Sequence, residues 1–256
     1  VMESEKGDIN LTSLNGSLYN EAGADLLAGD GDITLSAKSN KAGYYYTVYN
    51  EQNKSIDEVY VAEGTPIYDY DDFGGKYIIA NGEKQDVVKN GSVFNAGDAM
   101  AINGTIRIIS EYGDVTNYDD FNTLLNANGD ESEFYKTASN PNGIDIATGN
   151  VELLAAHGTL YNTKDLESGQ NITLMAAKGL TNFAYNVYAG KNISLTATEG
   201  DVLNTATLES YAGDVTLQAY DGNVINGAET GLNPGQGDII TYGGNVTLLA
   251  QGSGSV

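Results

Sequence analysis

The sequence predicts an all-β fold, a parallel β-helix solenoid with about 21 to 22 residues per coil and irregular insertions between some coils. Three observations predict it: a motif recurs along the chain, its apolar residues alternate with polar ones, and glycines mark its corners. Consecutive copies at Ile172, Ile193 and Val215 lie 21 and 22 residues apart. Counted from the first apolar residue, the copies begin at Ile9, Ile33, Ile106, Val151, Ile172, Ile193, Val215 and Val246.

The apolar residues within each copy predict strands rather than helices. Single polar residues separate Ile193, Leu195 and Ala197, which is the period of two expected for a strand buried on one face. Helical repeats need apolar spacings of three and four, so tetratricopeptide-like and ankyrin-like folds are excluded. A second short apolar segment follows each glycine, as in residues 200–204. We therefore expect two short strands per coil, joined at corners formed by glycine, aspartate and asparagine.

An asparagine recurs at nearly the same offset in the second segment of the coils. Equivalent positions of a parallel β-helix stack at strand spacing, so the amides can hydrogen-bond from coil to coil as a ladder. We favour this structural interpretation over the alternative of a groove lined by amides. The predicted ladder residues are Asn20, Asn117, Asn162, Asn182, Asn204 and Asn226.

Composition and charge narrow the class of protein. The chain has 32 Gly, 3 Pro and no Cys among 256 residues, as expected for an all-β repeat protein stabilised by stacking instead of disulfides. The formal net charge of -23 argues against a nucleic-acid partner and against an anionic lipid surface, because both require clustered Lys and Arg. No apolar run is long enough to predict a membrane span.

Two segments, residues 38–105 and 118–148, break the repeat, and we expect them to be insertions or irregular coils. Residues 91–95 match the second half of the repeat, so part of the first segment is expected to return to the solenoid. Residues 1–256 are otherwise interpreted as one continuous β-helix segment of a longer protein, since neither a signal peptide nor a recognisable solenoid cap is present.

The copies at residues 190–204 and 213–226 carry a resemblance to a known family. They resemble the repeats of filamentous haemagglutinin-type exoproteins, which are exported by two-partner secretion, and are particularly similar to the filamentous adhesins grouped with fusobacterial leukotoxin. The resemblance covers residues 7–37, 102–117 and 149–251. It implies a right-handed parallel β-helix, a secreted or bacterial cell-surface location, an outer-membrane transporter as partner during secretion, and adhesion to a host-cell surface or extracellular-matrix ligand.

The first interruption contains eight of the 18 tyrosines of the chain. Tyrosine combines a flat apolar face with a polar tip, which suits sugar stacking and protein contact. The expected ligand-binding residues are Tyr44, Tyr45, Tyr46, Tyr49, Tyr68 and Tyr70. The alternative, which we favour, is a side strand packed on the solenoid. No cofactor is expected, but calcium would suit the oxygen ligands of a nearby acidic run, Asp69, Asp71 and Asp72.

We expect the chain to be no enzyme. Asp114 and Asp201 lie at Gly-Asp corners, where a carboxylate commonly caps its own turn, and His157 lies at a corner that also accepts Lys, Glu and Asp. Arg107 is the single arginine, so the basic residue that polysaccharide lyases need is scarce. Three hypotheses remain: an adhesin shaft, a segment of a leukotoxin-type toxin that targets host cells, and a carbohydrate-active β-helix enzyme.

Overall fold

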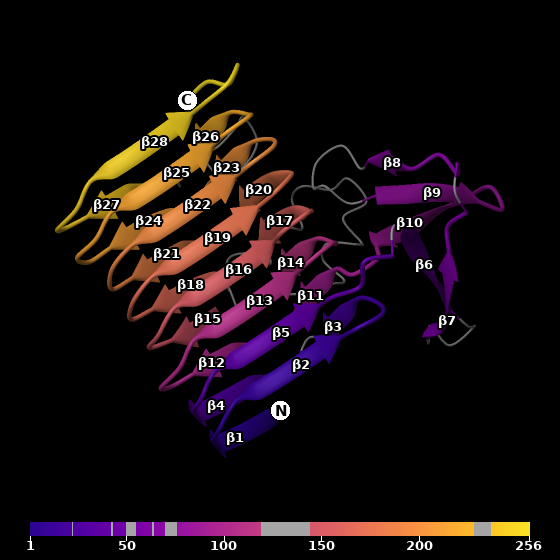
Figure 1. Cartoon of the computed structure of the whole chain (residues 1–256), viewed down its shortest axis with the longest axis horizontal. Helices are drawn as coiled ribbons and strands as arrows, with labels where there is room; N and C mark the ends of the chain where they lie inside the picture. The colour runs from indigo at the N-terminus through magenta and orange to yellow at the C-terminus, as the bar shows by residue number, and fades with distance from the viewer. Residues whose placement is uncertain are drawn as a thin grey trace.

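A computed structural model describes residues 1–21, 23–41, 43–49, 55–62, 64–69, 76–118, 144–227 and 237–256. These residues form 28 strands and no helix. Three long parallel sheets stack coil upon coil along the molecule, and a small antiparallel sheet lies to one side of them (Figure 1). The predicted parallel β-helix is therefore confirmed.

The three parallel sheets are numbered here by their first strands. The strands of sheet 1 are, in order, β1 (Met2–Lys6), β4 (Leu26–Asp30), β12 (Ala99–Ala101), β15 (Ile144–Ala147), β18 (Asp165–Ser168), β21 (Asn186–Ala189), β24 (Thr207–Ser210) and β27 (Ile239–Thr241). Those of sheet 2 are β2 (Ile9–Ser13), β5 (Ile33–Ala37), β13 (Ile106–Ser110), β16 (Val151–Ala155), β19 (Ile172–Ala176), β22 (Ile193–Ala197), β25 (Val215–Ala219) and β28 (Val246–Ala250). Those of sheet 3 are β3 (Leu18–Asn20), β11 (Val93–Asn95), β14 (Val115–Asn117), β17 (Thr159–Asn162), β20 (Gly179–Asn182), β23 (Val202–Asn204) and β26 (Val224–Asn226).

Each coil contains three strands, so the expectation of two strands per coil was wrong. The chain runs from sheet 2 through sheet 3 to sheet 1, as in β19, β20 and β21, before β22 starts the next coil. The third strand has only two inward-facing side chains, such as Val187 and Ala189 in β21. An alternation of two residues is too short to distinguish a strand from a corner in the sequence.

The core is built from rows of side chains in exact register. Ile172 pairs with Ile193, Leu174 with Leu195 and Ala176 with Ala197, and all six side chains are buried. Removal of these apolar surfaces from water is the main favourable contribution to folding. The row also includes Val246, which pairs with Val215 but is 45% exposed because β28 is the last strand of sheet 2.

The small antiparallel sheet, called the side sheet below, leaves the solenoid between β5 and β11 (Figure 1). Its strands, in spatial order, are β7 (Ser55–Tyr60), β6 (Tyr44–Tyr49), β10 (Glu83–Lys89), β9 (Lys76–Ala80) and β8 (Tyr68–Asp69). Val61, Ile78 and Val87 form its own small core. Asn90 lies where the side sheet joins the solenoid, and its side-chain amide donates to Ser39 Oγ at 2.7 Å.

The two interruptions have different outcomes in the structure. Within residues 38–105, β11 and β12 lie in sheets 3 and 1, so the inserted part ends before β11. Of residues 118–148, the positions 119–143 lie outside the described residues. The chain rejoins sheet 1 with β15.

The corners between sheets 1 and 2 carry a column of side-chain oxygens, called the corner column below. Asp8 Oδ1 accepts a hydrogen bond from the backbone N–H of Asp32 at 2.9 Å, and Asp32 Oδ1 accepts one from Thr105 at 2.9 Å. The remaining acceptors of the column are Thr105, Asn150, Asn171, Asn192 and Asp214.

Corner carboxylates between sheets 2 and 3 behave in the same way. Asp114 Oδ1 accepts from the backbone N–H of Thr159, and Asp201 Oδ1 accepts from Asn223. The expectation that these carboxylates cap their own turns was therefore wrong, because they cap the following coil. Glycine at these corners permits the close approach: a Cβ on Gly158 would collide with the backbone carbonyl of Gly113 in the preceding coil.

Candidate binding surfaces

The asparagines of sheet 3 form one hydrogen-bonded ladder inside the solenoid. Each side-chain amide donates to the Oδ1 atom of the next asparagine at 2.7 to 2.8 Å. The ladder runs through Asn20, Asn95, Asn117, Asn162, Asn182, Asn204 and Asn226. The amides bind one another in the interior, so they do not line a groove for a ligand.

Asn95 is a ladder residue that was not included in the predicted set. Its side-chain amide accepts from Asn20 and donates to Asn117, each at 2.7 Å, and the residue is buried. The signal was present in the sequence, because residues 91–95 match the second half of the repeat. The insertion before this copy breaks the period and hides its offset.

The side sheet separates the predicted ligand-binding tyrosines into two groups. Tyr44 and Tyr46 pack against the small core of the side sheet. Tyr45 instead meets Tyr60 edge to face, with ring centroids 5.3 Å apart, and lies on the opposite side of β6 because strand side chains alternate. The structure thus assigns packing to Tyr44 and Tyr46 and leaves Tyr45 beside an exposed ring.

A second aromatic pair lies near the other edge of the side sheet. Tyr68 of β8 stacks on Tyr77 of β9, with ring centroids 5.4 Å apart. Tyr60 and Tyr68 are 48% and 45% exposed. Exposed rings held by a neighbouring ring are rigid contact surfaces, because little side-chain entropy is lost when a ligand covers them.

The remaining residues predicted to bind a ligand or calcium lie at or beyond the edge of what the structure describes. Tyr49 lies in β6 and Asp69 in β8, but their side chains are outside the description, and Tyr70, Asp71 and Asp72 lie outside the described residues. In the part of the chain that the structure describes, no three His, Cys, Asp or Glu side chains gather to hold a metal ion. The expectation of calcium on the acidic run stays a prediction.

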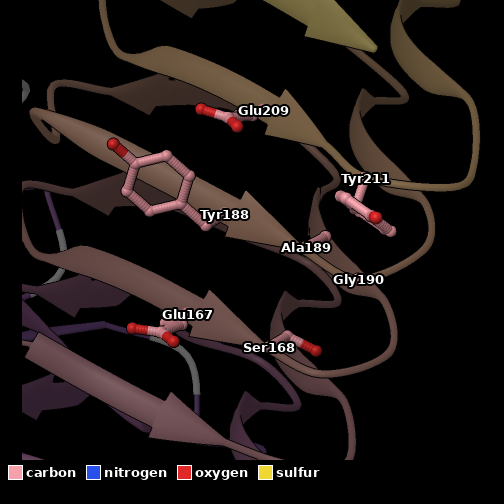
Figure 2. Close-up of a pocket in the computed structure, with 7 residues that line it drawn as sticks. All are labelled: Glu167, Ser168, Tyr188, Ala189, Gly190, Glu209 and Tyr211. Atoms are coloured by element: carbon pink, nitrogen blue, oxygen red, sulfur yellow. The ribbon is translucent and has the colours of Figure 1, made fainter. Parts of the chain in front are cut away.

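A shallow groove of about 200 Å³ lies on the outer face of sheet 1. Glu167, Tyr188 and Glu209 are register partners on β18, β21 and β24, and their side chains form one column (Figure 2). Tyr211 follows β24 directly and lies near Ala189 and Gly190 at one end of the groove (Figure 2). The sequence did not indicate this groove, because the third strand of the coil was not recognised.

The electrostatics of the groove keep the central tyrosine protonated. Burial raises the pKa of Tyr188, and the neighbouring carboxylates of Glu209, Asp165 and Glu167 raise it further. Its hydroxyl group remains a donor at neutral pH, while the two flanking glutamates are acceptors. An aromatic face between hydrogen-bond acceptors suits sugar hydroxyl groups or a cationic group.

The basic residues that lyase chemistry would require are engaged elsewhere. Arg107, on the outer face of sheet 2, contacts Asp32 at 2.7 Å and Glu152 at 3.1 Å, one in each neighbouring coil. His157 lies at a corner, where its ring stacks on Tyr112 and its Nδ1 atom is 2.9 Å from the carbonyl oxygen of Glu111. Both side chains link adjacent coils.

Comparison of the chain with protein-family models, with curated proteins and with solved structures found no match. Across the described ranges, no helix is long and apolar enough to cross a membrane.

Proposed function

We propose that the chain is a shaft segment of a secreted or surface-exposed bacterial adhesin, of the filamentous haemagglutinin type that its repeats resemble. One observation carries the proposal: a regular stack of coils bears, at one corner, a separate side sheet with exposed tyrosines. A solenoid whose coils contact only their neighbours forms an extended scaffold. The side sheet then supplies the surface that attaches to a host cell or to the extracellular matrix.

The negative charge of the chain determines which forces can hold it against a cell surface. With a net charge of -23, the chain is repelled by sialylated cells, but salt screens this repulsion within about 8 Å at physiological ionic strength. Aromatic contacts act at shorter range and are worth about 0.5 to 1.5 kcal/mol beyond area burial. Tyr60 and Tyr68 therefore form the proposed contact, and binding should strengthen when salt is added.

A second candidate, a carbohydrate-active enzyme, is favoured by the groove on sheet 1. Glu167 and Glu209 lie two strands apart, which at roughly 4.8 Å per strand separates their backbones by about 9.6 Å. Inverting glycosidases place their carboxyl groups roughly 6.5 to 9.5 Å apart. The groove is shallow and open to water, so we favour binding over hydrolysis. A leukotoxin-type segment would use the same surfaces to target host cells.

Excision of the side sheet tests the adhesin proposal. Deletion of residues 40–90 joins Ser39 to Gly91, which leaves four corner residues between β5 and β11, with glycine third. The uninterrupted corner between β13 and β14 also has four residues and has Gly113 third. The shortened chain should keep its β-sheet circular dichroism signal. Its affinity for cells should fall at least about tenfold, which corresponds to a loss of about 1.4 kcal/mol of binding free energy.

Point variants refine this test. Tyr60→Ser with Tyr68→Ser should lower cell binding as the deletion does, whereas Tyr220→Ser, at an equally exposed tyrosine outside both surfaces, is the matched control. Tyr44→Ala is unsuitable because Tyr44 packs in the side-sheet core. Unchanged binding by the folded deletion variant would contradict the proposal. Release of reducing sugar from a polysaccharide panel, lost in Glu209→Gln, would favour the enzyme instead.

A further inference from the structure

A charged pair occupies the interior where neighbouring coils have only small or apolar residues. Asp145 of β15 pairs with Ala99 and with Leu166 in the inward-facing row of sheet 1. Lys164 follows the ladder residue Asn162 by two positions. The equivalent corner residues of the next two coils are Ala184 and Ala206, both fully buried.

The two side chains are completely enclosed and face each other. Lys164 and Asp145 are each 0% exposed, and Lys164 Nζ is 3.6 Å from Asp145 Oδ1. Lys164 Nζ also donates to the carbonyl oxygen of Gly97 and lies 3.4 Å from Asp98 Oδ1. The amine therefore lies between two carboxyl groups, one buried and one that is 38% exposed.

The two oxygens of Asp145 have different surroundings. Oδ1 accepts a hydrogen bond from the backbone N–H of Ala99 at 2.9 Å. Oδ2 is buried and has no hydrogen-bond partner among the described residues. A backbone N–H aimed at one oxygen stabilises negative charge that develops on it, as an oxyanion hole does.

Burial also favours the neutral form of Asp145. Desolvation raises the pKa of Asp145, and the charge of Lys164 opposes this rise. Because both side chains are fully buried, proton transfer from the ammonium group to the carboxylate removes two buried charges at once. The result is a free amine next to a carboxylic acid, held at a fixed distance, and such orientation lowers the entropic barrier to their reaction.

We propose that Lys164 and Asp145 condense to form an intramolecular amide, a covalent cross-link between two successive coils. After the proton moves from Lys164 to Asp145, the Nζ lone pair attacks Cγ, and the Ala99 N–H stabilises the charge on Oδ1. Asp98 takes a proton from nitrogen and passes it to Oδ2. The bond between Cγ and Oδ2 then breaks, and Oδ2 leaves as water. One carboxylate and one ammonium group are converted into one amide and one water, so no oxidant or cofactor is needed.

This inference is independent of the proposed adhesive function and concerns the covalent structure of the shaft. The bond would close a loop of the chain between residues 145 and 164, immediately after residues 119–143. A covalent link of this kind restricts the unfolded chain, as a disulfide does, in a sequence that has no cysteine.

Mass spectrometry of the purified full chain tests the proposal. The intact mass should be lower than the sequence mass by one water. Trypsin should fail to cleave after Lys164, because an acylated lysine is not recognised, and should yield a single peptide of residues 137–178 that is also one water lighter. A chain of full mass that trypsin cleaves after Lys164 would overturn the cross-link. Loss of water with normal cleavage there would assign the loss to another residue and overturn it equally.

Two variants serve as controls. Asp98→Asn keeps the shape of the proton carrier and should restore the full mass and cleavage after Lys164. Complete cross-linking in this variant would overturn the role of Asp98. The double variant Asp145→Leu with Lys164→Ala copies residues found at the equivalent positions of other coils, so it should fold without the link. Its intact mass and its peptide of residues 137–178 should both equal the masses expected from the variant sequence, and they set the reference for the uncrosslinked chain.

Discussion

The coils of the solenoid and the side sheet bury their apolar residues in different ways. A coil residue such as Leu195 packs in a row that continues through the coils above and below, and it pairs with Leu174 and Leu217. Among its described residues, the side sheet has a separate core of three buried side chains, with tyrosines packed around it. A coil therefore depends on both neighbours for its stability, whereas the side sheet depends mainly on itself.

This contrast extends to how the two regions satisfy their polar groups. In the solenoid, buried amides and corner oxygens bind their equivalents one coil away. In the side sheet, the strands are antiparallel and most pairing joins segments that are near in sequence, such as β9 and β10. A local change should therefore spread along the shaft but remain confined in the side sheet.

The largest expected effect is that of a charge in the shared core. Leu195→Asp places an unpaired carboxylate in a dry row, which costs several kcal/mol and should unfold the adjacent coils. Val87→Asp should melt only the side sheet. Hydrogen exchange read by mass spectrometry should show lost protection over β19 to β25 in the first variant and over β6 to β10 in the second.

Ser194→Asp is the matched control, because Ser194 lies on the same strand and points outward. It should leave the protection pattern unchanged. Full protection of β22 in Leu195→Asp would show that the interior row tolerates charge. It would contradict the claim that each coil depends on its neighbours for stability.

An intermediate effect is expected when the ladder is interrupted. Asn182→Leu removes one donor and one acceptor, so Asn162 and Asn204 lose their hydrogen bonds to residue 182. Each unsatisfied buried group costs about 1 to 3 kcal/mol, so the two together should lower the free energy of unfolding by roughly 2 to 6 kcal/mol. Urea titration should detect this, with the outward-facing Thr181→Ala as control. Equal urea midpoints for the two variants would show that the ladder hydrogen bonds do not contribute to stability.

The smallest effect concerns a carboxylate of the corner column. The backbone N–H of Thr105, and then Arg107, lower the pKa of Asp32 below its ordinary value of 3.8. A lowered pKa contributes stability that is present above pH 3.8 and is lost as the pH falls through the lower, folded-state value. Because solvent screens this partly exposed pair, the contribution should stay below about 1 kcal/mol.

Asp32→Asn should therefore destabilise the chain slightly at pH 7 and leave it closer to the wild type under strongly acidic conditions. Urea midpoints of both proteins across this pH range measure the difference. A constant difference at all pH values would attribute the effect to packing and not to the charge of Asp32.

The parts of the fold that repeat could be predicted from the sequence. Residues such as Ile172, Leu174 and Ala176 recur at one spacing, so their strand, their inward face and their stacking follow from the pattern. The asparagine ladder follows from the same logic, except at Asn95, where an insertion obscures the period. Repetition makes weak local signals readable because each copy adds the same information.

The parts that occur once could not be predicted. The groove around Tyr188 depends on a strand with too few alternating residues to be recognised. The alternation of Tyr44 to Tyr46 could not indicate which ring faces the side-sheet core, because both faces of β6 carry tyrosine. Nothing in the sequence indicates that Lys164 turns inward, since a single lysine at a corner is normally solvated.

The corner column gives the shaft a direction. In each of these hydrogen bonds the side-chain oxygen belongs to the earlier coil and the backbone N–H to the later one. Asn171 accepts from the backbone of Asn192 in this way, and Asn192 accepts from the backbone of Asp214. A finished coil therefore presents acceptors that only the next stretch of chain can fill. Because a polypeptide emerges N-terminus first, every completed coil is a template for the segment that follows it. We expect vectorial folding, in which the shaft lengthens toward its C-terminus one coil at a time.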